Sequence, residues 1–151
     1  MVDWNTRIQD DLRLLHETGV LNATTPRDEF EAWKAYNRRP NSYQIVGRGL
    51  YVIQLEQYLA AMDRAGKARS DLYVLQSEAF RNNRQSEYNK LLEFLDLPAH
   101  TLMNLTDEHV TSTSEESMPL PQSIRIQLQE IYRPYNLRLF ELLEWDEVWR
   151  Y

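Results

Sequence analysis

The sequence contains no cysteine and only four glycines, and each shortage excludes a class of chemistry. Without cysteine there can be no disulfide framework, no thiolate nucleophile and no cysteine-based zinc site, and a reducing cytoplasmic location fits. None of the glycines lies in a Gly-x-x-x-x-Gly-Lys or a Pro-Lys-x-Gly-Thr-Thr pattern. The chain therefore lacks the loop in which backbone amides at a helix N-terminus bind phosphate.

Excess positive charge and long apolar runs are also missing. The formal net charge is −6, whereas a nucleic-acid surface needs clustered lysine and arginine, so we expect no nucleic-acid partner. No stretch approaches the roughly 20 apolar residues of a membrane span, which predicts a soluble protein without one. The three histidines, His16, His100 and His109, have no metal-ligand spacing, so we expect no metal site.

The apolar residues that are present recur at helical spacing and predict a mainly α-helical chain. A length of 151 residues fits one domain, 1–151, whose residues 1–40 form a helical N-terminal extension. Gly19 is expected to end the first helix, and Thr25 to cap the second ahead of Pro26. Helices are predicted over residues 4–18, 26–37, 50–66, 87–95 and 124–142.

One short strand is predicted at Leu72–Leu75, a run of apolar residues that favour extended backbone. A single strand cannot form a sheet, and each backbone group buried without a partner costs on the order of 1–3 kcal/mol. We therefore expect either a second copy of the chain, in a homodimer, or a separate partner chain to complete the sheet at Leu72–Leu75.

An ordered series of short signatures runs from residue 47 to 143. Its members are Arg48-Gly49-Leu50-Tyr51 with Gln54-Leu55, Ser77-Glu78 after the predicted strand, Leu91-Leu92-Glu93-Phe94-Leu95 before a Leu-Pro stop, and Tyr132, Pro134 and Asn136. This series resembles the C-terminal half of sulfotransferases of the heparan-sulfate and polyketide-associated type. The resemblance implies part of an α/β, P-loop-like fold, here mainly α with one short strand.

The resemblance also implies an activity and a donor. Such enzymes transfer a sulfuryl group from 3′-phosphoadenosine 5′-phosphosulfate (PAPS) to a hydroxyl or amine acceptor and release adenosine 3′,5′-bisphosphate (PAP). It places Arg48 and Tyr51 beside the acceptor cleft, which makes them substrate-side candidates, with a purely structural role as the alternative. Tyr132 and Asn136 are expected to be architectural, and no catalytic or cofactor-binding residue is assigned.

The sequence departs from the family pattern at both donor loops. The N-terminal half with its lysine-bearing phosphosulfate loop is absent, and the usual 3′-phosphate loop is replaced by residues 113–119, in which Glu115 and Glu116 would repel phosphate. Two hypotheses follow. The chain is a sulfotransferase-family protein that is incomplete or inactive alone, or it is a non-catalytic sulfotransferase-like binding or scaffold module, monomeric or dimeric.

Overall fold

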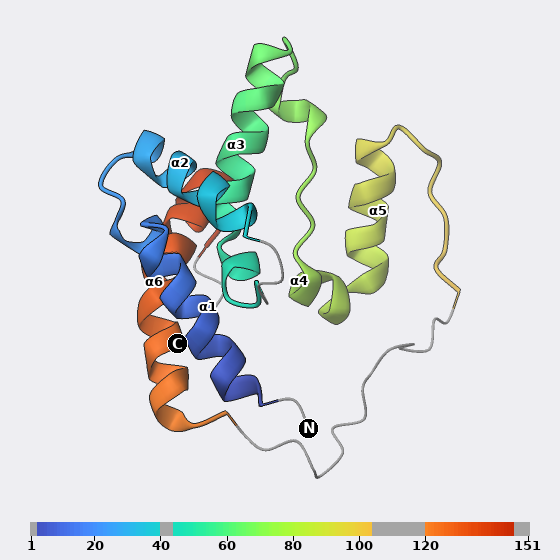
Figure 1. The fold of residues 1–151 in the computed structure, drawn as a ribbon. Helices are drawn as coiled ribbons and strands as arrows, with labels where there is room; N and C mark the ends of the chain where they lie inside the picture. Colours follow the sequence, from blue (N-terminus) through green and yellow to red (C-terminus); the bar gives the residue numbers. More distant parts are fainter. Residues whose placement is uncertain (1–2, 40–43, 104–119, 147–151) are drawn as a thin grey trace. The chain divides into compact units, whose positions relative to one another are not determined.

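The computed structural model describes residues 3–39, 44–103 and 120–146. In these ranges the chain is helical, with short 3-10 turns and no β-strand, which confirms the prediction of a mainly α-helical protein (Figure 1). The α-helices are α1 (Trp4–Glu17), α2 (Pro26–Asn37), α3 (Tyr51–Arg64), α4 (Ser77–Asn82), α5 (Arg84–Phe94) and α6 (Gln122–Leu143). The 3-10 turns are η1 (Val20–Asn22), η2 (Gly47–Gly49) and η3 (Arg69–Asp71).

The helix ends that the sequence predicts are present. The Thr25 hydroxyl accepts a hydrogen bond of 3.1 Å from the backbone amide of Asp28, and Pro26 is the first residue of α2. Gly19 follows α1 with φ +85°, in the left-handed region that favours glycine. These caps satisfy backbone groups that the helix itself leaves unpaired.

The strand predicted at Leu72–Leu75 does not form within the described residues of this chain. Leu72 and Gln76 have extended backbone angles (φ −116° and −82°, ψ 123° in both), but the segment between them is not paired. Within the described ranges, the amides of Tyr73, Val74 and Leu75 donate to no backbone carbonyl. The residue types favour the extended conformation, whereas a strand also requires a neighbour. The sequence also missed α4, which follows directly.

The chain divides into two compact units. Unit 1 comprises residues 1–61 and 119–151, and unit 2 comprises residues 62–118. The boundary falls in the last turn of α3. Whether both units act as one domain, as the sequence predicts, stays a prediction.

Unit 1 contains the hydrophobic core. Helices α1, α2, α3 and α6 and the segment before α3 contribute apolar side chains to one cluster, in which Leu15, Tyr36, Leu50 and Val52 have no exposed surface. In α1, apolar residues three and four positions apart form the buried face. The core thus joins segments that lie far apart in the sequence.

Unit 2 has little interior by comparison. Among its described residues, 62–103, Leu92 alone is a buried apolar side chain. The Tyr73 ring packs on Phe94 at 5.2 Å between centroids, and the Gln85 side chain bonds to the backbone of His100 and Leu102 at 3.0 and 2.8 Å. Several large apolar side chains stay exposed: Leu75, Phe94, Leu95, Leu97 and Met103.

Candidate functional site

Arg48 and Tyr51 lie at one turn of unit 1, before and at the start of α3. Arg48 is the middle residue of the 3-10 turn η2 and is exposed; Tyr51 is the first residue of α3, and 55 % of its surface is exposed. In the part of the chain that the structure describes, no carboxylate pairs with the Arg48 guanidinium. An unpaired cation and an exposed aromatic residue three positions later are suited to contact an anionic or polar ligand.

A buried carboxylate holds the backbone of this turn. Asp11 on α1 is 2 % exposed, and its Oδ2 accepts a hydrogen bond of 2.7 Å from the amide of Val46 and a longer one of 3.4 Å from that of Gly47. Its Oδ1 accepts 2.7 Å from the hydroxyl of Tyr36, which lies on α2. Asp11 therefore connects α1 to α2 and to the segment that leads into Arg48.

Two tyrosine rings pack against the glycines on either side of Arg48. A Cβ atom at Gly47 would lie 2.2 Å from the Tyr36 hydroxyl oxygen, and one at Gly49 would lie 2.7 Å from Cε1 of Tyr132. The Tyr132 hydroxyl donates to the backbone carbonyl of Val46 at 2.8 Å, an architectural contact of the kind that the sequence predicts. Only residues without a side chain fit so close to these rings.

Burial and the neighbouring carboxylate keep both hydroxyls protonated. Burial, then the hydrogen bond to Asp11 and the charge of Asp11, raise the pKa of Tyr36 far above its ordinary value. Burial raises the pKa of Tyr132 to about 12, and the charge of Asp11 acts in the same direction. Neither tyrosine is poised to act as a base, so both serve as hydrogen-bond donors that hold the turn.

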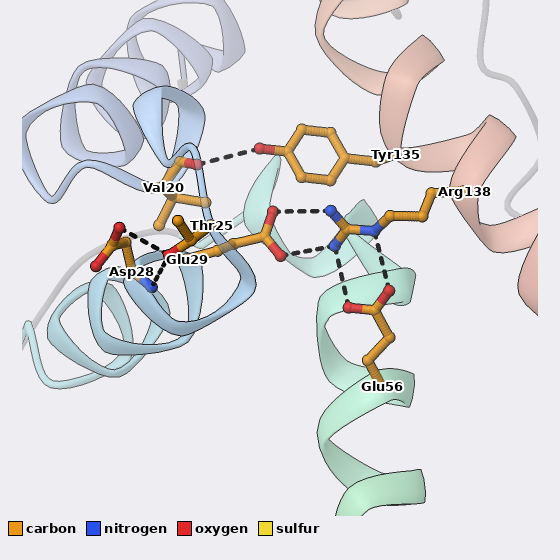
Figure 2. Close-up of polar contacts among 7 residues, drawn as sticks. All are labelled: Val20, Thr25, Asp28, Glu29, Glu56, Tyr135 and Arg138. Atoms are coloured by element: carbon orange, nitrogen blue, oxygen red, sulfur yellow. Dashed lines mark hydrogen bonds and ion pairs between the residues drawn. The ribbon is translucent and has the colours of Figure 1, made fainter.

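A second polar cluster connects three helices of unit 1 (Figure 2). The Arg138 guanidinium on α6 donates two hydrogen bonds to Glu29 on α2, at 3.1 and 2.6 Å, and one of 3.2 Å to Glu56 on α3. Arg138 Nε also lies 3.0 Å from Glu56 Oε1, an ion-pair distance at which the N–H does not point at the oxygen. On the same side of α6, the Tyr135 hydroxyl donates to the carbonyl of Val20 at 3.2 Å.

The two carboxylates of this cluster differ in exposure. The Glu29 side chain is 9 % exposed, whereas those of Glu56 and Arg138 are 35 % and 37 % exposed. Burial raises the pKa of Glu56, Arg138 opposes this, and the charge of Glu29 adds to it. Burial lowers the pKa of Arg138, but the hydrogen bond to Glu29 and both carboxylate charges outweigh it and raise that pKa overall. The cluster is thus an inter-helix tie with one surplus negative charge.

Sequence reasoning singles out Arg48 and Tyr51 as candidates but not the residues that hold the turn before them. In the sequence, Asp11 is one of two adjacent acidic residues, after Asp10. The signal was its spacing: it lies three residues after Ile8 and four before Leu15, on the apolar face of α1. A carboxylate on a buried face needs donors, which Tyr36 and Val46 supply. No local pattern predicts that partners 25 and 35 residues away provide them.

The rest of the described surface offers a further candidate for a binding site. A shallow depression of about 440 Å³ lies beside the end of α1 and the start of α2, lined by small residues such as Gly19, Ala32 and Ala35 and by Asp28 and Glu31. In the described residues, no three His, Asp or Glu side chains are grouped to hold a metal ion, and no helix is long and apolar enough to cross a membrane.

The chain matches no known family model, no curated protein and no solved structure.

Proposed function

We propose that this chain is the acceptor-side part of a sulfotransferase that moves a sulfuryl group from PAPS to a hydroxyl or amine. In this role Arg48 contacts the anionic sulfuryl group or an anionic acceptor, and Tyr51 packs against the acceptor. The observation that carries the proposal is the exposed, unpaired Arg48 on a turn whose backbone is fixed by Asp11. A cation held on a rigid element stabilises developing negative charge better than one on a mobile chain.

The order of elements after this turn supports the same proposal. Helix α3 begins at Tyr51, as the resemblance implies for its Arg-Gly-x-Tyr segment. The extended residues 72–76 lead into Ser77 and Glu78 at the start of α4, and α5 ends just before the Leu-Pro stop. An extended segment with free backbone groups is what a sheet strand looks like when the rest of the sheet is supplied from elsewhere.

The donor nucleotide needs contacts that the described residues do not supply. Phosphate sites are built from backbone amides at a glycine-rich loop or from clustered cations. In the described ranges, Gly19 and Gly66 end helices, and Gly47 and Gly49 are packed on tyrosine rings. The segment 113–119, with Glu115 and Glu116, lies outside the described residues. We infer that another polypeptide segment completes the donor site, so that the chain alone is inactive.

A second candidate is a non-catalytic module that binds a partner through unit 2. The apolar side chains exposed there and the unpaired amides of residues 73–75 favour it. Completion of a sheet at Leu72–Leu75, by a second copy in a homodimer or by a separate chain, would cover both features. This interpretation requires no donor site at all.

Calorimetric titration of the purified chain with PAP tests whether the chain alone keeps a nucleotide site, and the inferred need for another segment predicts no heat of binding. Micromolar binding would contradict that need and show that a nucleotide site survives, and a transfer assay with PAPS and a panel of hydroxyl and amine acceptors then tests activity. An Arg48→Met variant in that assay tests the acceptor-side role. No heat of binding from a folded chain rules out a stand-alone enzyme. If sedimentation then also shows a stable homodimer, the module is favoured.

A further inference from the structure

We propose that Asp11 is a positioning residue for Arg48, and that its negative charge acts through the backbone of the turn and not through direct contact with a ligand. The inference rests on the proposed role of Arg48 as the cationic contact. Asp11 itself is 2 % exposed and cannot touch a ligand in solvent. It lies on α1, in the N-terminal extension that the sulfotransferase resemblance does not cover.

The groups that contact the Asp11 carboxylate are all hydrogen-bond donors. Tyr36 donates to Oδ1, and the amides of Val46 and Gly47 donate to Oδ2. A carboxylate accepts at both oxygens, whereas an asparagine side chain accepts at one and donates at the other. With its oxygen kept on Tyr36, the amide group of Asp11→Asn would face the two backbone amides with a donor of its own. The substitution keeps the shape of the side chain and breaks the clamp.

A shift of the Val46 backbone would move Arg48, which lies two residues later in the same turn. The carbonyl of Val46 accepts from the amide of Gly49 at 3.0 Å and from the Tyr132 hydroxyl at 2.8 Å, so Val46 is held through its carbonyl as well as through its amide. Gly47 and Gly49 leave no space for the turn to shift toward either ring. Release of the Val46 and Gly47 amides leaves the segment that carries Arg48 held only through the Val46 carbonyl, and so held less firmly.

The charge of Asp11 and its positioning role predict opposite effects of Asp11→Asn on anion binding. A buried negative charge near an anion-binding arginine repels the anion, so neutralising Asp11 should tighten anion binding if charge were its only influence. If Asp11 positions Arg48, neutralising it weakens anion binding instead. The sign of the change distinguishes the two roles.

Amide hydrogen exchange by NMR tests the clamp. In Asp11→Asn we expect the amides of Val46 and Gly47 to exchange roughly tenfold faster than in the parent chain. The amide of Asp28, which donates to Thr25, should not change. Asp10→Asn is the matched control, because Asp10 is the exposed neighbour paired with Arg13 at 2.6 Å and touches nothing in the turn.

Tyr36→Phe is a milder variant that still tests the clamp if Asp11→Asn does not fold. It removes one donor to Asp11 and leaves the carboxylate, both backbone amides and the ring in place. We expect a smaller acceleration at Val46, roughly threefold, in a chain that stays folded. Unchanged exchange at Val46 and Gly47 in both variants would overturn the clamp.

Titration with inorganic sulfate, followed by the amide shifts of Arg48 and Gly49, tests the positioning. We expect roughly tenfold weaker sulfate binding in Asp11→Asn, no weakening in Asp10→Asn, and loss of the shifts in Arg48→Met. Tighter binding in Asp11→Asn would overturn the positioning role. If sulfate shifts neither amide in the parent chain, the anion contact of the proposed function fails, and the positioning role fails with it; faster exchange in Asp11→Asn would then leave Asp11 a purely structural clamp.

Discussion

Units 1 and 2 differ in what their backbone and apolar groups contact. Unit 1 buries a connected cluster from four helices, whereas the described part of unit 2 buries a single leucine, Leu92. Burial of apolar surface is the main stabilising term in folding, at roughly 25 cal/mol per Å². Unit 1 can therefore hold a site rigidly, and unit 2 is expected to open more readily unless something covers it.

The same contrast appears in the non-helical backbone. In unit 1, the amide of Val46 donates to a buried carboxylate 35 residues away. In unit 2, the described amides of residues 73–75 have no such acceptor. The proposed roles of the two units follow from this difference: the first presents Arg48 on a fixed turn, and the second leaves an extended segment open for a partner.

The largest expected effect comes from one methyl group at Gly47. Gly47→Ala places a Cβ 2.2 Å from the Tyr36 hydroxyl oxygen inside the clamp, and we expect a loss of about 3 kcal/mol or more in the free energy of unfolding. Gly66→Ala in unit 2 is the matched substitution. No atom lies near its Cβ, and its φ of +67° alone should cost about 1 kcal/mol. Urea denaturation of both variants checks the difference, and equal losses would contradict the packing of the turn.

Truncating one leucine in each unit compares the two interiors. Leu15→Ala removes a side chain with no exposed surface, and we expect it to destabilise the chain by about 3 kcal/mol. Leu92→Ala should cost about 1 kcal/mol in global unfolding, because few buried groups surround it. Thermal denaturation followed by circular dichroism measures both. A larger loss for Leu92 would mean that unit 2 carries more of the stability than its burial indicates.

The Arg138 cluster should respond unequally to removal of its members. Arg138→Met leaves Glu29 and Glu56 facing each other, and we expect a loss of about 2 kcal/mol at neutral pH, less than for a fully buried pair. Glu56→Gln keeps the Glu29–Arg138 pair and should change stability by at most about 0.5 kcal/mol. Chemical denaturation at low salt tests the ranking. A greater loss in Glu56→Gln would reverse the assigned roles.

The pH dependence of Glu56 has a definite sign. Because burial raises its pKa in the folded chain, the folded state takes up this proton at a higher pH than the unfolded state does. Protonation of Glu56 therefore adds stability as the pH falls through that raised value toward the ordinary glutamate range. Stability measured over this window should rise less in Glu56→Gln than in the parent chain. Identical profiles would exclude a contribution from Glu56.

The smallest effect on stability is expected at the apolar surface of unit 2. Leu95 and Leu97 are each 50 % exposed, so Leu97→Lys should change the free energy of unfolding by no more than about 0.5 kcal/mol. It should lower the binding of an apolar dye and any self-association, because it replaces an exposed apolar side chain with a charged one. Dye fluorescence and sedimentation measure this. A large loss of stability would show that Leu97 already packs in an interior.

The sequence alone predicts the helices of this fold well. Apolar spacing gave α1, α2, α3 and α6 nearly to the residue, and the local chemistry of Thr25 and Gly19 marked their ends. These signals are local, because a helix satisfies its backbone within a few residues. The strand predicted at Leu72–Leu75 does not form within the described residues, because a strand needs a neighbouring strand and the residue types of one segment do not supply it.

The site could be predicted only at its exposed positions. Arg48 and Tyr51 carry a recognisable sequence pattern, whereas Asp11, Tyr36 and Tyr132 come together from three helices across about 120 residues. Spacing on α1 indicates that Asp11 is buried but not which groups bind it. Likewise, nothing near Glu29 indicates that Arg138 binds it. Such pairs follow from packing, which a single sequence does not specify.

The most direct test of the contrast between the units is amide hydrogen exchange of the intact chain, resolved by residue. We predict that the amides of Val46 and Gly47 exchange only when unit 1 unfolds, whereas those of residues 73–75 exchange at close to the rate of an unprotected peptide. Fast exchange at Val46 would contradict the fixed turn that presents Arg48. Strong protection at residues 73–75 in the monomer would contradict an open segment that awaits a partner.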